Sequence, residues 1–129
     1  MTQLQGAYVF YLIWLTAGFT DFRLHRASDL AHTSGLRESR LHGVQLAVIG
    51  IGVLLWCAFT LTGVVMLILL AIAVLHACLG YADTRSAYGV RPIVPAEQHV
   101  HSILDLAPWI FLAWSAWHAS SLWSIEWAP

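Results

Sequence analysis

Residues 64–81 read VVMLILLAIAVLHACLGY, an almost unbroken apolar run in which His76 is the one side chain that can carry a positive charge. As a helix with a rise of 1.5 Å per residue, the run would cover about 27 Å, close to the ~30 Å hydrocarbon thickness of a bilayer. A helix also satisfies all of its own backbone hydrogen bonds, which lipid cannot do. The stretch therefore predicts a transmembrane helix and decides the kind of fold to expect.

Three further apolar stretches accompany this one. A Thr-Gly step at 62–63 separates it from residues 44–62, which predicts a tight hairpin, and residues 4–20 and 103–123 complete a set of four. Only 10% of the chain is charged, against about 25% in a soluble domain, so the chain lacks the polar residues to coat a globule. We therefore expect one all-α integral membrane domain over residues 1–129, a four-transmembrane-helix bundle with cytoplasmic helix extensions.

The cations are all arginines, and they lie in the two longer links between the predicted spans. They are Arg23, Arg26, Arg37, Arg40, Arg85 and Arg91. Because positively charged loops stay inside, these links are expected to be cytoplasmic and both termini outside, in a bacterial-type inner membrane with lipids as neighbours. The net charge of −1 with neutral His offers no basic field for nucleic acid.

Acidic and histidine side chains recur together near the cytoplasmic ends of all four spans. Each pair is spaced by four or seven residues, which places both members on one helix face. The pairs are Asp21 with His25, Glu38 with His42, His76 with Asp83, and Glu97 with His101 followed by Asp105. The two halves of the chain carry them in a similar order, which suggests a two-fold internal pseudo-repeat.

This pattern predicts a metal centre, because ionisable groups near hydrocarbon are costly unless they are paired or bind a cation. Imidazole and carboxylate sets suit Fe, Mn or Zn, and four-helix bundles hold two such ions between facing helices. We therefore expect two divalent metal ions, iron first, with Zn and Mn as alternatives. The predicted ligands are His25, Glu38, His42, His76, Asp83, Glu97 and His101, with Asp21, Asp105 and His99 as further ligands or as groups that orient them. The competing interpretation is that the acids only form salt bridges with Arg23, Arg37, Arg40 and Arg85 at headgroup level.

Parts of the pattern look like sequence boxes in the two cytoplasmic links: His25-Arg26, Glu38-Ser39-x2-His42 and Pro95-x-Glu97-Gln98-His99-x-His101. They resemble the histidine boxes of membrane-bound lipid desaturases and hydroxylases, which place a di-iron centre at the cytoplasmic face. The chain differs from these enzymes in lacking HxxxH and HxxHH and in being much shorter. The resemblance implies a di-iron oxidoreductase that acts on a lipid or another apolar substrate.

Other functions fit the same residues. A zinc-dependent membrane hydrolase and a non-catalytic accessory subunit of a larger membrane complex are both alternatives. Metal transport is disfavoured, because the outer halves of the first three spans offer no ionisable relay. No P-loop, GxGxxG or CxxCH motif points to a nucleotide or a c-type haem. The substrate does not follow from the sequence, and a homodimer is left open.

Overall fold

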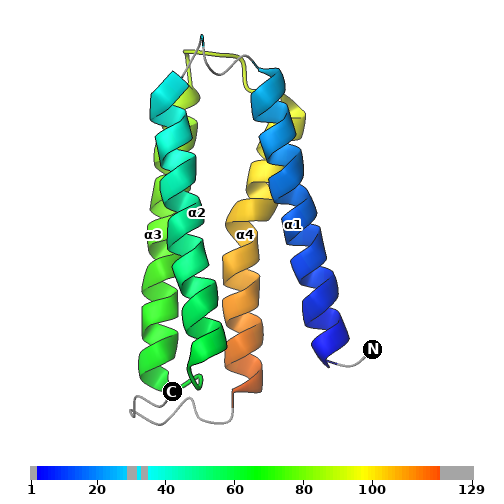
Figure 1. Ribbon diagram of the computed structural model, residues 1–129, viewed down its shortest axis with the longest axis vertical. Coiled ribbons are helices and arrows are strands. Elements are labelled where there is room, and N and C mark those ends of the chain that lie inside the picture. Colours follow the sequence, from blue (N-terminus) through cyan, green and yellow to red (C-terminus); the bar gives the residue numbers. More distant parts are fainter. Residues whose placement is uncertain (1–2, 29–31, 33–34, 120–129) are drawn as a thin grey trace.

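The computed structural model describes residues 3–28, 32 and 35–119, which form four long helices (Figure 1). In chain order these are α1 (Gln3–Ala27), α2 (Gly35–Ala58), α3 (Gly63–Ala87) and α4 (Pro95–His118). The predicted all-α class is confirmed. Each helix runs past its apolar stretch toward the end of the bundle that carries the α1–α2 and α3–α4 links. Residues 120–123 of the last predicted span lie outside the described residues.

Local sequence sets two of the helix starts. The Thr62 hydroxyl accepts a hydrogen bond from the backbone N–H of Val65 at 3.4 Å and so caps the start of α3. Pro95 stands in the first turn of α4, where its missing N–H would have no helical partner. Short-range signals therefore fix where α3 and α4 begin, and the bundle geometry follows from packing.

The helices pack as two pairs that are joined along one side. α2 packs against α3, α1 packs against α4, and α4 also packs against α3. α1 leans away from α2 toward its N-terminal end (Figure 1). A cavity of about 1470 Å³ lies between α1 and α2, and we refer to its apolar part as the apolar groove. The groove is lined by Tyr11, Trp14, Leu15 and Phe19 of α1 and by Leu46, Ile49, Val53 and Leu54 of α2.

Burial in this bundle is the reverse of that in a soluble protein. The buried apolar residues are few and mostly small, whereas large apolar side chains such as Leu46, Leu54 and Leu67 are about 70% exposed. Seven ionisable side chains of the described residues, in contrast, are buried, and Glu38 has no exposed surface at all. Among the described helices, α2 and α3 are long and apolar enough to cross a membrane. This distribution fits a protein whose outer surface meets lipid.

Two glycines of α2 provide a test of the α2–α3 contact. A Cβ at Gly52 would lie 3.1 Å from Cγ2 of Ile72, whereas a Cβ at Gly50 would have no atom within 4 Å. We expect Gly52→Leu to lower the free energy of unfolding by about 1–3 kcal/mol, because overpacking forces the two helices apart. Gly50→Leu should cause no such loss. Unfolding of both variants in detergent measures this, and equal losses would contradict the described packing.

Candidate metal centre

The four helices bring their acidic and histidine side chains together at the end of the bundle near the α1–α2 and α3–α4 links. Every helix contributes at least one buried carboxylate. The gathered residues are Asp21 and His25 of α1, Glu38 and His42 of α2, Asp83 of α3, Glu97 and His101 of α4, and Arg91 of the α3–α4 link. We refer to these residues as the polar cluster.

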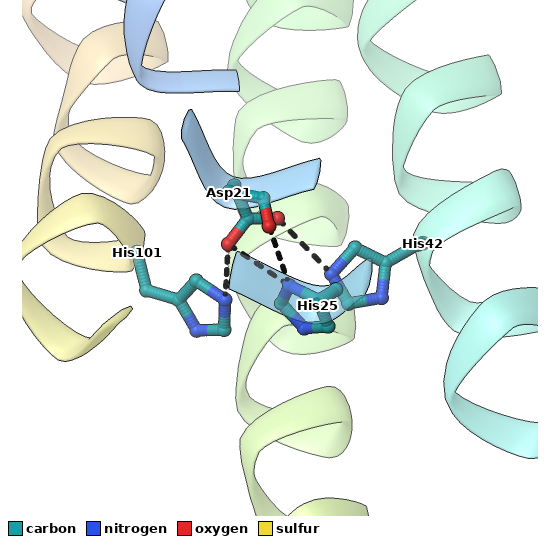
Figure 2. Close-up of side chains that lie close together, drawn as sticks. All are labelled: Asp21, His25, His42 and His101. Atoms are coloured by element: carbon teal, nitrogen blue, oxygen red, sulfur yellow. Dashed lines mark hydrogen bonds and ion pairs between the residues drawn. The ribbon is translucent and has the colours of Figure 1, made fainter. Parts of the chain in front are cut away.

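Asp21 is surrounded by three imidazoles (Figure 2). Its Oδ1 lies 2.9 Å from Nε2 of His101 and 3.3 Å from Nδ1 of His25, and its Oδ2 lies 3.4 Å from Nε2 of His42. One possible ligand atom from each of these four residues lies within 4.8 Å of all the others. The four side chains could therefore hold a single metal ion, and we refer to them as the aspartate set.

A second set of four overlaps the first. It consists of His25, Glu38, His42 and Asp83, again with one ligand atom each within 4.8 Å of the others. Nε2 of His25 lies 2.9 Å from Oε1 of Glu38, and Nδ1 of His42 lies 3.4 Å from Oδ1 of Asp83. We refer to it as the glutamate set; the two sets share both His25 and His42.

Helical hydrogen bonds orient the shared imidazoles. Nδ1 of His25 donates to the backbone carbonyl of Asp21 at 2.9 Å, and Nδ1 of His42 donates to that of Glu38 at 3.1 Å. Such a bond places the proton on Nδ1 and leaves Nε2 as the ligand nitrogen. His99 makes the same local bond to Pro95 but is exposed, so the bond itself is a property of histidine in a helix. What marks the clustered histidines is the acid that each Nε2 faces.

Several buried polar atoms of the cluster contact a neighbouring imidazole or carboxylate without forming a hydrogen bond. They are Oδ1 of Asp21, Oδ1 of Asp83 and Nε2 of His101. The first and the last of these lie only 2.9 Å apart without hydrogen-bond geometry, as two atoms would if both pointed at a common ion. Because buried polar groups in proteins are almost always satisfied, these atoms fit a site that binds a cation.

The charge balance points the same way. Asp21, Glu38, Asp83 and Glu97 are all buried, and Arg91 is the buried guanidinium among them. Four carboxylates and one guanidinium leave a surplus of three negative charges, which costs several kcal/mol unless it is compensated. A divalent ion together with a protonated imidazole would offset it.

Protons take part of this role when no ion is bound. Asp21 and His25 lie beyond the apolar stretch of α1. Burial alone would raise the pKa of Asp21, but its contacts with the surrounding imidazoles hold that pKa well below the usual range. Burial alone would lower the pKa of His25, but its bonds to Asp21 and the charges of Asp21 and Glu38 raise it to about 9. The cluster therefore favours positive charge strongly.

Arg91 is the cluster member that the sequence analysis missed. Its side chain is 1% exposed, and it donates to both oxygens of Glu38 and to both oxygens of Glu97. The competing interpretation assigned the salt bridges to four other arginines, whereas the structure gives Glu38 and Glu97 this buried partner. A usable signal was its place at the start of the segment Arg91-Pro92-Ile93-Val94-Pro95, because two prolines stiffen the short link that carries the arginine.

The other predicted site residues belong to neither set. His76 and Asp105 line the same cavity as the aspartate set but belong to neither set. Asp105 rests against Gly80, where an added Cβ would lie 2.8 Å from its Oδ1. Glu97, a member of the polar cluster, accepts hydrogen bonds from Arg91, and its Oε1 lies 3.5 Å from Nε2 of His25. His99, expected to be an additional ligand or an orienting group, is exposed on α4.

Comparison with protein-family models, with curated proteins and with solved structures gives no match. The chemistry of the site is therefore argued from its own geometry.

Proposed function

We propose that this chain is an integral-membrane, metal-dependent oxidoreductase that acts on a lipid or another apolar substrate. The observation that carries the proposal is a shared cavity. Asp21, His25, His42 and His101 line one part of it, and the apolar groove lines another part of the same wall. A substrate that enters sideways from the bilayer between α1 and α2 would reach the polar cluster while its apolar part stays in contact with apolar side chains.

The proposed placement has all four helices crossing the membrane. Large apolar side chains are exposed on α1 and α4 as well as on α2 and α3, among them Leu15, Phe19, Ile110 and Trp114. Leaving this surface in water would expose far more contiguous apolar area than soluble proteins tolerate. Lipid contact on all four helices removes that cost and leaves the polar cluster at one membrane face.

Orientation follows from the arginines. A reporter enzyme that is active only outside the cytoplasm is expected to be active when fused after Pro129 and inactive when inserted at Gly89, in the α3–α4 link. The physical reason is that loops rich in arginine are retained on the cytoplasmic side. Measuring reporter activity per unit of fusion protein in cells gives the answer. The opposite pattern would place the polar cluster at the outer face.

Iron is the metal that we propose first. Imidazole and carboxylate ligands suit it, and bound iron would supply oxygen-dependent oxidation of an unreactive C–H bond. The chain's own residues would hold the ion, fix the imidazoles through their Nδ1 bonds and keep water away by means of the groove. Zinc is the second candidate, for a hydrolase, because three imidazoles and one carboxylate also form a set that zinc accepts.

Metal analysis separates these proposals. Protein purified without chelator is expected to contain stoichiometric iron. After the metal is stripped, the protein is reloaded with Fe²⁺ without oxygen and then exposed to O₂. The visible spectrum should change, because O₂ can oxidise the bound Fe²⁺. Stoichiometric zinc without an O₂-dependent change would favour the hydrolase. A chain that takes up neither Fe²⁺ nor Zn²⁺ would contradict both.

A further inference from the structure

We propose that Arg91 acts as a built-in cation in the second cation position of the polar cluster, so that the centre holds one divalent metal ion on the aspartate set. The inference rests on the proposed metal site and differs from the two ions that the sequence predicts. It makes Arg91 a positioning residue that determines how many metal ions the bundle accepts.

The guanidinium stands where a second ion would bind. Nη2 of Arg91 donates to Oε1 of Glu38 and to Oε1 of Glu97, and it lies 3.3 Å from Nε2 of His25. Two carboxylates and one imidazole around a single point are the ligands that a bundle offers to a metal ion. Here that point is taken by a nitrogen that carries part of a permanent positive charge.

Arg91 donates hydrogen bonds to both carboxylate oxygens of Glu38 and to both of Glu97. Nε donates to Oε2 of Glu38 at 3.2 Å, and Nη1 donates to Oε2 of Glu97 at 2.9 Å, so both carboxylates are held in a bidentate manner. Bidentate guanidinium–carboxylate pairs are strong and geometrically specific. A metal ion would have to displace this buried side chain before it could use either glutamate.

The unsatisfied atoms of the polar cluster are not on the partners of Arg91, which are Glu38, Glu97 and His25. They belong to Asp21, His101 and Asp83, for which no bond to the guanidinium is described. Of the two sets, the glutamate set contains Glu38, whose two oxygens are already held by the guanidinium. The aspartate set contains neither glutamate held by Arg91. Its Asp21, His42 and His101 are left to bind an ion, while Nε2 of its His25 lies beside the guanidinium.

The test is the number of Zn²⁺ ions bound per chain, measured by elemental analysis of saturated, desalted protein. Wild type is expected to bind one Zn²⁺, and Arg91→Met two, because Glu38 and Glu97 become free. Arg85→Met, which removes an exposed arginine near the same end of the bundle, should stay at one. Wild type that binds two ions, or Arg91→Met that stays at one, would overturn the inference while the proposed metal site stands.

A second pair of variants covers the case in which Arg91→Met does not fold. The double variant Glu38→Gln/Glu97→Gln should still bind one Zn²⁺, because neither glutamate is a ligand in wild type. Asp21→Asn should lose it. Loss of Zn²⁺ in the glutamine double variant would overturn the role given to Arg91. Wild type that binds no Zn²⁺ and no Fe²⁺ would overturn the metal site itself.

Discussion

Replacing His101 by alanine is expected to weaken Zn²⁺ binding by more than about 100-fold, since loss of even an outer-shell partner costs 10–100-fold in affinity. His99→Ala is expected to leave the affinity unchanged. The two histidines lie on α4 two positions apart, but Nε2 of His101 lies 2.9 Å from Asp21 whereas His99 is exposed. Position relative to the polar cluster is therefore what distinguishes the two variants.

Chelator competition and thermal unfolding measure the difference. A ligand at 100 times its Kd stabilises the folded state by about 2.7 kcal/mol, so Zn²⁺ should raise the melting temperature of wild type and of His99→Ala. The same Zn²⁺ concentration should barely shift His101→Ala. Equal affinities in the two variants would show that His101 is not a ligand.

Helical spacing in the sequence predicts which side chains share a face, and this part of the site prediction agrees best with the structure. The steps from Asp21 to His25 and from Glu38 to His42 predict that these residues meet at one end of the bundle, and the structure places all four within the two sets that could hold a metal ion. Spacing, however, does not determine the level along the bundle axis at which each side chain meets the neighbouring helices. That depends on how far each helix is shifted along its neighbour.

The stripe of Glu97, His101 and Asp105 on α4 shows the consequence. Each step of four residues descends about 6 Å along a helix, so the three side chains reach three different levels. Glu97 meets Arg91, His101 meets Asp21, and Asp105 rests against Gly80. The sequence predicts that all three approach one centre or its surroundings, but only His101 belongs to a set that could hold a metal ion.

Arg91 could not be placed by periodicity, because it lies in the link between α3 and α4. The path of a link depends on its turns and on where the two helices end, and neither has a repeat to follow. The sequence also gives no direct measure of burial for an arginine, which is usually exposed. Its 1% exposed side chain is therefore a finding of the structure alone.

The same burial makes Arg91→Met the most destabilising single change that we expect in the metal-free protein. Removing one partner of a buried ion pair costs about 3–5 kcal/mol, because it leaves an uncompensated charge. Arg91 is the guanidinium among four buried carboxylates, so its loss adds one unit to the surplus of negative charge. Glu97→Gln lowers the surplus instead and keeps the shape of the side chain, so we expect it to change stability by only about 1 kcal/mol.

Denaturant unfolding in detergent measures these differences, with Arg85→Met as the control for losing an exposed arginine. The triple variant Arg91→Met/Glu38→Gln/Glu97→Gln should recover most of the loss, because replacing a whole buried ion cluster by neutral groups is often close to neutral in stability. Recovery would assign the cost of Arg91→Met to uncompensated charge. If the triple variant were as unstable as Arg91→Met, the arginine would stabilise the bundle through packing of its side chain, and charge would not be the cause.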